Sequence, residues 1–163
     1  MVRINPNGRH YFPFYHRMRK VAMKQKLKCI LLIDDDEATN YFSNFIIEEA
    51  ECAVHVKTKR TAKAALNYLA DSGHLNQQQN SLPFPDLIFL DINMPAMDGW
   101  EFLEHYKMIE SNFPNKPTII MLSTSLNPND KIKALGIPAV ADFQNKPITV
   151  EMIHTILDKY FPN

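Results

Sequence analysis

The sequence has few cysteines and no long apolar run, and each shortage excludes a class of protein. Its 163 residues contain only two cysteines, Cys29 and Cys52, which provide neither a disulfide framework nor a CxxC metal-binding pair. The longest apolar runs, such as Cys29–Ile33, are far shorter than the roughly 18 residues that a membrane span needs. We therefore expect neither a disulfide scaffold, a zinc finger nor a membrane protein, and we expect a cytoplasmic location.

Acidic residues are missing from the first part of the chain, although the net charge of the whole is zero. Residues 1–28 contain eight basic residues and no acidic one, so residues 29–163 have a net charge of −8. A folded part this acidic repels nucleic acid, which disfavours direct DNA binding by it.

The first 26 residues show no helical or strand period, and Pro6, Gly8 and Pro13 interrupt them. This composition predicts a basic, disordered N-terminal extension over residues 1–26, followed by one folded domain over residues 27–163. The alternative is a basic and aromatic arm that contacts nucleic acid or an acidic partner.

From Lys28 onward, short apolar runs alternate with amphipathic segments. Five strands that are each followed by a helix imply a parallel sheet with helices on both faces. We therefore predict an α/β fold with a doubly wound, five-stranded parallel sheet in the flavodoxin-like order 2-1-3-4-5. The predicted strands cover residues 29–33, 54–57, 87–90, 118–122 and 140–145, and the helices cover 38–50, 62–70, 99–109, 129–135 and 150–160, the last with Thr149 as its N-cap.

Polar residues follow four of these strands, at the edge where such a sheet binds ligands. The first strand leads into Asp34-Asp35-Asp36-Glu37, and the third into Asp91. The fourth leads into Ser123-Thr124 and the fifth into Lys146-Pro147. The sequence therefore predicts carboxylates, a hydroxyl and an ammonium at one edge.

This combination indicates phosphoryl chemistry. Carboxylates held close together repel one another, and a divalent cation removes the conflict. An all-oxygen ligand set favours Mg²⁺ over zinc or copper. With Lys146 and Ser123 beside it, the cluster can receive a phosphoryl group, and Asp91 is the best-placed nucleophile for an aspartyl phosphate.

From about Lys28 to Tyr160 the chain resembles the receiver domain of two-component response regulators. The acidic pair Asp34-Asp35 ends CILLIDDDE, and the phosphoacceptor matches Asp91 in PDLIFLDINMPAMDGWEFL. The resemblance implies that Mg²⁺ is bound by Asp34, Asp35, Asp91 and the main-chain carbonyl of Asn93.

The resemblance also assigns the remaining site residues. The switch hydroxyl matches Ser123 in IIMLSTS, and the switch aromatic and the lysine match Phe143 and Lys146 in DFQNKP. The Lys-Pro peptide bond is cis in most members of the family, which implies a cis bond before Pro147 in this sequence. Because a third acid follows, the metal pair could alternatively be Asp35-Asp36.

The family implies a mechanism and partners. A sensor histidine kinase or a histidine phosphotransfer protein offers a phosphohistidine, and Asp91 takes the phosphoryl group. Ser123 then moves toward Asp91, Phe143 turns into the vacated space, and a downstream protein reads the changed surface. The sequence ends at Asn163, so we expect a stand-alone receiver that catalyses only its own phosphorylation and dephosphorylation.

Three other functions fit the sequence less well. A haloacid-dehalogenase phosphatase needs a second acid after its nucleophile, whereas Asp91 is followed by Ile92-Asn93-Met94. A nucleotidase is disfavoured because no GxxxxGK[ST] loop exists. A docking module that works without phosphorylation is disfavoured because every receiver site residue is present.

Overall fold

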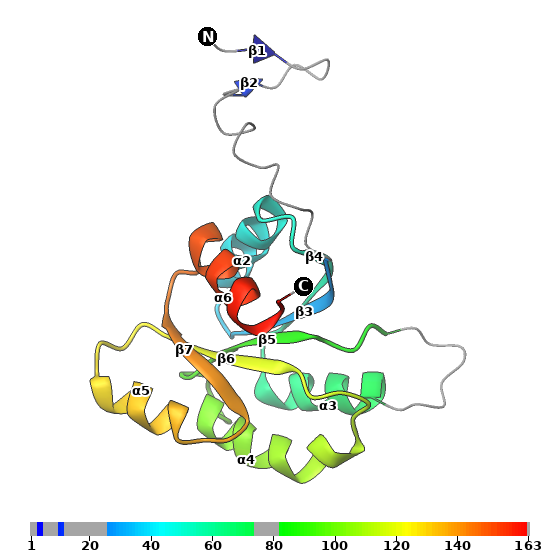
Figure 1. The fold of residues 1–163 in the computed structure, drawn as a ribbon. Helices are drawn as coiled ribbons and strands as arrows, with labels where there is room; N and C mark the ends of the chain where they lie inside the picture. Colours follow the sequence, from blue (N-terminus) through cyan, green and yellow to red (C-terminus); the bar gives the residue numbers. More distant parts are fainter. Residues whose placement is uncertain (1–2, 5–9, 12–25, 74–81, 163) are drawn as a thin grey trace.

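The computed structural model describes residues 3–4, 10–11, 26–73 and 82–162 (Figure 1). In the first two of these ranges, β1 (Arg3–Ile4) pairs antiparallel with β2 (His10–Tyr11). Apart from Lys26, the rest of the predicted extension lies outside the described residues, so its disorder stays a prediction. No helix in the described ranges is long and apolar enough to cross a membrane.

Five parallel strands form the central sheet. Its order, β4-β3-β5-β6-β7, is the second, first, third, fourth and fifth strand of the domain, so the predicted order 2-1-3-4-5 is confirmed. Every residue of the middle strand is buried, as expected for a strand covered on both faces. The strands are β3 (Leu27–Ile33), β4 (Ala53–Lys59), β5 (Leu87–Asp91), β6 (Thr118–Ser123) and β7 (Val140–Asn145).

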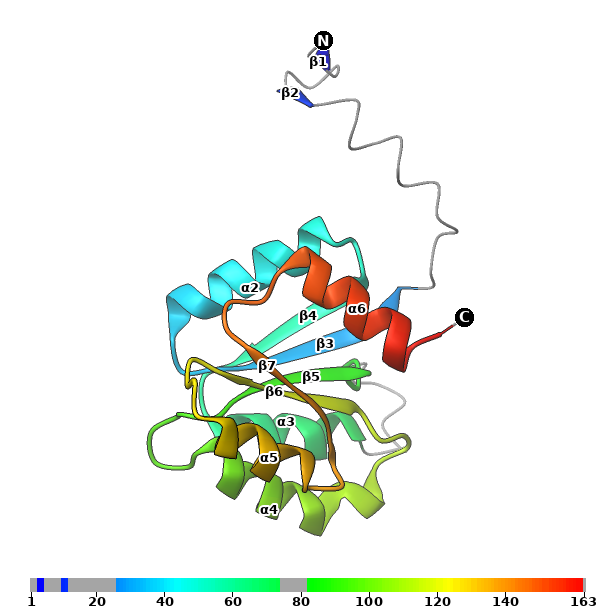
Figure 2. The same ribbon diagram turned by 60° about the vertical axis from the view of Figure 1, so that its left-hand side comes forward.

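Helices cover both faces of this sheet (Figures 1 and 2). One face carries α2 (Glu37–Glu49) and α6 (Val150–Tyr160), and the other carries α3 (Ala62–Gly73), α4 (Gly99–Ile109) and α5 (Pro128–Leu135). A short 3₁₀ turn, η1 (Glu110–Asn112), directly follows α4. The sheet is therefore the middle layer of three.

The alternation of side chains along β3 divides the core into two layers. Leu31 and Ile33 pack in the cluster that contains Phe102 of α4, whereas Ile30 and Leu32 pack in the cluster that contains Ile47 of α2 and Ile153 of α6. Successive strand residues point to opposite faces, so one apolar run supplies both layers and holds the sheet between its helices.

The helix starts are fixed by capping side chains. Thr149 accepts a hydrogen bond from the backbone of Met152 and caps α6 as predicted. Asp98 caps α4 in a capping box with Glu101. Predicted and observed bounds agree within three residues at every strand and helix, the largest difference being the extension of α3 to Gly73.

Candidate functional site

The register of the sheet brings the predicted site residues to one edge. Ile33 of β3 lies opposite Leu90 of β5, so the next residues in each strand, Asp34 and Asp91, are neighbours. Asp91 in turn lies opposite Leu122, the residue before Ser123. Parallel strands end on the same side, so this edge is the carboxyl edge of the sheet.

Three carboxylates converge there. One oxygen from each of Asp34, Asp35 and Asp91 lies within 4.8 Å of the others, and Asp34 and Asp91 are buried. A group of carboxylate oxygens suits a hard divalent cation such as Mg²⁺, which also keeps several waters. The donor set present therefore fits the predicted ion.

Lys146 reaches this cluster from the end of β7. Its Nζ lies 2.5 Å from Oδ2 of Asp34 and 2.7 Å from Oδ1 of Asp91, and its side chain is 12% exposed. The backbone N–H of Lys146 donates to the carbonyl of Ser123 at 2.9 Å, which ties the end of β7 to β6. The peptide bond between Lys146 and Pro147 is cis, as the resemblance implied.

Burial and the nearest opposite charges have opposing effects on the pKa values of Asp91 and Lys146. Burial raises the pKa of Asp91, and Asp34 adds to the effect, although Lys146 opposes it. Burial alone would lower the pKa of Lys146, but the two carboxylates outweigh it and the pKa is raised. Among the described residues, the ammonium of Lys146 contacts two of the three clustered carboxylates, Asp34 and Asp91. The cluster therefore has more carboxyl groups than this one positive charge can neutralise, which favours a further cation.

Asp36 has a different position from the other acids. Its carboxylate accepts a hydrogen bond from the backbone of Thr39 at 2.9 Å and caps α2. That backbone hydrogen bond is the largest influence on Asp36 and lowers its pKa. The geometry thus favours Asp34-Asp35 over Asp35-Asp36 as the acidic pair.

The other predicted residues lie around this cluster. Ser123 is fully buried, and its hydroxyl oxygen accepts a hydrogen bond from the backbone of Ser125 at 2.9 Å. Asn93 is exposed, and its backbone N–H donates to the carboxylate of Asp91. Phe143 is buried in the core cluster that contains Met121, its neighbour on β6. The direct contacts thus join the acids and Lys146, with Ser123 and Phe143 on the adjoining strands.

Sequence reasoning missed two residues that contact the backbone of Asp34 and Asp35, the turn between β3 and α2 that is called the acidic turn below. Asn40 of α2 donates to the carbonyl of Asp34, and Arg60, after β4, donates to the carbonyl of Asp35. A polar residue on the buried side of an amphipathic helix is a signal that could have identified Asn40. The exposed Arg60 carries no such signal.

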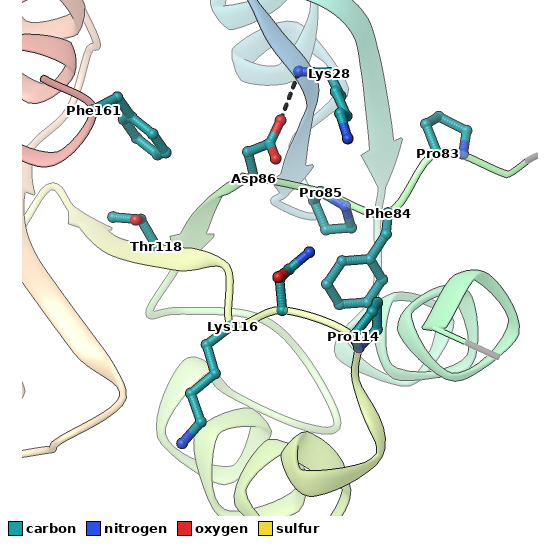
Figure 3. Close-up of a pocket in the computed structure, with 10 residues that line it drawn as sticks. Lys28, Pro83, Phe84, Pro85, Asp86, Pro114, Lys116, Thr118 and Phe161 are labelled. Atoms are coloured by element: carbon teal, nitrogen blue, oxygen red, sulfur yellow. Dashed lines mark hydrogen bonds between the residues drawn. The ribbon is translucent and has the colours of Figure 1, made fainter. Parts of the chain in front are cut away.

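The structure also has a cavity of about 320 Å³ at the opposite edge of the sheet (Figure 3). Lys28, Asp86 and Thr118 are among its lining residues, and they lie where β3, β5 and β6 begin. It is therefore separate from the carboxylate cluster, which lies where the strands end.

Comparison with known proteins identifies the domain. The family model described as the response regulator receiver domain matches residues 30–158. The two-component response regulator ARR5 of Arabidopsis thaliana is 31% identical over 138 residues, which are 82% of this chain and 70% of that protein. Four other curated relatives are much longer, and the chain spans between 9% and 30% of their lengths.

Solved structures agree with this match. The crystal structure of a two-component response regulator from Cytophaga hutchinsonii has a TM-score of 0.74 and 30% identity, covering 83% of this chain and 97% of that one. The receiver domain of the histidine kinase CKI1 from Arabidopsis thaliana, complexed with Mg²⁺ and BeF₃⁻, has the same fold, with a TM-score of 0.66 and 20% identity over 80% of this chain and 90% of that one. The chain belongs to the response regulator receiver domain family of two-component signalling proteins.

Proposed function

We propose that this receiver accepts a phosphoryl group from a phosphohistidine onto Asp91 and signals through protein–protein contact. The observation that carries the proposal is the position of Lys146, whose Nζ lies 2.7 Å from Oδ1 of Asp91 beside two further carboxylates. An ammonium and a carboxylate cluster at one point suit a dianionic phosphoryl group that arrives with a divalent cation.

Asp34, Asp35 and Asp91, together with the main-chain carbonyl of Asn93, would hold Mg²⁺. When bound, the ion supplies positive charge that offsets the repulsion between the incoming phosphoryl oxygens and the carboxylates. The CKI1 receiver domain, which shares this fold, was solved in complex with Mg²⁺, and this supports the same ion here.

In the proposed transfer, one carboxylate oxygen of Asp91 attacks phosphorus. The new P–O bond forms as the P–N bond of the phosphohistidine breaks, and the electron pair of that bond stays on the imidazole nitrogen. Lys146 retains its proton and pairs with a phosphoryl oxygen, while the hydroxyl of Ser123 donates to another. The protein supplies position and charge, which are the main requirements of phosphoryl transfer.

The proposed donor is a sensor histidine kinase or a histidine phosphotransfer protein. Among the relatives are two proteins of Dictyostelium discoideum that are named hybrid signal transduction histidine kinases, and this supports a histidine kinase as the donor. We propose a cytoplasmic place of action for this exchange, and no direct contact of the folded part with DNA, because residues 29–163 have a net charge of −8.

The proposed output is a change in the surface formed by α5, β7 and α6. Ser123 would leave its hydrogen bond with the backbone of Ser125 to reach the phosphoryl group, and Phe143 would turn into the space it leaves. Exposed apolar side chains on α5, Ile132 and Leu135, offer a downstream protein a contact on this surface.

The test is transfer of radiolabelled phosphate to the purified protein. A phosphorylated histidine kinase, or phosphoramidate as a small P–N donor, should label the wild-type chain in the presence of Mg²⁺. Asp91→Asn should abolish the label. Asp98→Asn is the matched control, because Asp98 caps α4 and asparagine caps equally well, so this variant should keep it.

Three outcomes contradict the proposal. Label that persists in Asp91→Asn would place the acceptor elsewhere. Steady turnover of added phosphate esters would favour the phosphatase alternative. A wild-type chain that accepts no label from any P–N donor, yet binds its partner, would favour a docking module that works without phosphorylation.

A further inference from the structure

The first observation concerns Asn40, the fourth residue of α2. Its side-chain Nδ2 donates to the backbone carbonyl of Asp34 at 2.7 Å, and both residues are 6% exposed. Its Oδ1 is buried and has no hydrogen-bond partner among the described residues. Burying an unpaired amide oxygen is unfavourable, so packing alone gives no reason for an asparagine at this position. Its donor function toward Asp34 does.

The second observation concerns Arg60, which directly follows β4 and is exposed. Its Nε and Nη2 donate to the carbonyl of Asp35 at 3.3 and 3.2 Å, and its Nη1 lies 3.4 Å from the carboxylate of Glu37. Three of its N–H groups thus hold the segment that leads from β3 into α2. A guanidinium can do this because its donors lie in one rigid plane.

Together these contacts hold two consecutive carbonyls: the buried Asn40 binds that of Asp34, and the exposed Arg60 binds that of Asp35. Fixing the carbonyls of Asp34 and Asp35 fixes the dihedral angles of the turn, and so the directions in which their carboxylates leave the backbone. Lys146 acts differently, because its ammonium contacts the carboxylate of Asp34. Mg²⁺ demands near-ideal octahedral geometry, so its binding is sensitive to small rotations of this turn.

We propose that Asn40 and Arg60 are positioning residues that clamp the Asp34-Asp35 turn and thereby set the affinity of the site for Mg²⁺, an inference that rests on the proposed function. The clamp acts on the backbone, and neither side chain touches the ion or the phosphoryl group. Partners that orient metal ligands from outside the ligand set commonly change metal affinity by about 10- to 100-fold.

A purely electrostatic role of Arg60 predicts the opposite sign. A positive charge near the site repels Mg²⁺, so removing it should tighten Mg²⁺ binding if charge were all that mattered. The clamp predicts weaker binding. Arg60→Lys separates the two further, because lysine keeps the charge but loses the planar set of donors.

The experiment measures the Kd of the intact chain for Mg²⁺ by isothermal titration calorimetry. The clamp predicts a Kd about tenfold higher in both Arg60→Gln and Arg60→Lys. Lys59→Gln is the matched control: it removes one positive charge from the adjacent residue, whose ammonium lies over the ring of Tyr68, and should leave the Kd unchanged or lower. A Kd in Arg60→Gln that equals or falls below that of the wild type overturns the proposal.

Asn40→Ala tests the inner half of the clamp, with amide hydrogen exchange in EDTA as a readout that needs no metal. The backbone N–H of Asp36 donates to Oδ1 of Asp34, and its exchange should accelerate in Asn40→Ala and in Arg60→Gln. Unchanged exchange in both variants overturns the proposal. If Asn40→Ala does not fold, the Arg60 variants decide the outcome alone.

Two further comparisons separate this inference from the proposed function. With phosphoramidate, the Mg²⁺ concentration for half-maximal labelling should rise in the Arg60 variants while the rate at saturating Mg²⁺ recovers; a rate that stays low at saturation contradicts a role in metal affinity. If the wild-type chain binds no Mg²⁺ and accepts no phosphoryl group, the proposed function fails, and the exchange measurement still decides whether the turn is clamped.

Discussion

Replacing Lys146 by methionine tests whether one ammonium holds the acidic cluster together. In the absence of metal, Lys146 is the cation that contacts Asp34 and Asp91, and the three side chains are only 12%, 8% and 6% exposed. Removing one partner of a buried ion pair costs about 3–5 kcal/mol, because the remaining charge stays buried without compensation.

This loss has a measurable size in thermal unfolding. For a domain of this length, 1 kcal/mol corresponds to roughly 3 °C in Tm, so Lys146→Met should lower the Tm by about 10 °C in EDTA at neutral pH. Mg²⁺ should then stabilise the variant more than the wild type. In the wild type, by contrast, the ion has to compete with the ammonium for the same carboxylates.

The double variant Asp91→Asn/Lys146→Met completes a double-mutant cycle. Removing one carboxylate should recover part of the stability that Lys146→Met loses. Lys159→Met is the control: Lys159 pairs with Asp142 at 3.2 Å but is 58% exposed, and surface pairs contribute about 0–1 kcal/mol. A Tm of Lys146→Met in EDTA within roughly 2 °C of the wild-type value, or a smaller Mg²⁺ response than that of the wild type, would refute the reasoning.

Four further predictions concern single residues elsewhere in the site and the core. Asp91→Asn should unfold at a higher temperature than the wild type in EDTA at neutral pH, because burial raises the pKa of Asp91 and a raised carboxyl pKa means that ionisation disfavours the folded state; a lower Tm would contradict this. Gly99→Ala should weaken phosphorylation, since its Cβ would lie 2.6 Å from the carbonyl oxygen of Asp91, and a wild-type labelling rate would contradict the close approach. Cys52 should react slowly with a thiol reagent at pH 8 and quickly after unfolding, because burial raises its pKa to about 11; rapid reaction of the folded protein would show that the thiol is accessible. Burial opposes the ionisation of Asp142, but hydrogen bonds, the first from the backbone of its neighbour, outweigh burial and lower its pKa, so the stability advantage of the wild type over Asp142→Asn should be present at neutral pH and be lost as the pH falls below about 4; an advantage that persists at pH 2, by urea unfolding, would rule this out.

The sequence by itself determined the layout of the fold. Apolar runs such as Cys29–Ile33 and Leu87–Leu90 stand out because a strand buried on both faces needs apolar residues at every position. Helices with a 3.6-residue period follow each run, and that alternation admits few topologies. The carboxyl edge of the sheet then collects whatever residue ends each strand, so Asp34, Asp91 and Lys146 could be assigned to one place from their positions alone.

Only the tertiary structure decided what these residues contact. Lys146 and Asp34 are separated by 112 positions, and no local pattern records whether an ammonium at a strand end turns toward one carboxylate or two. Asp36 lies in a run of acidic residues whose separate roles the sequence does not distinguish. In the structure, its carboxylate caps the start of α2. Asn40 reaches the same turn from α2, and Arg60 reaches it from the position directly after β4; such contacts depend on how elements pack in three dimensions. Periodicity records burial and not side-chain partners, and this is why the sheet and its edge could be predicted while the hydrogen bonds that orient the acidic turn could not.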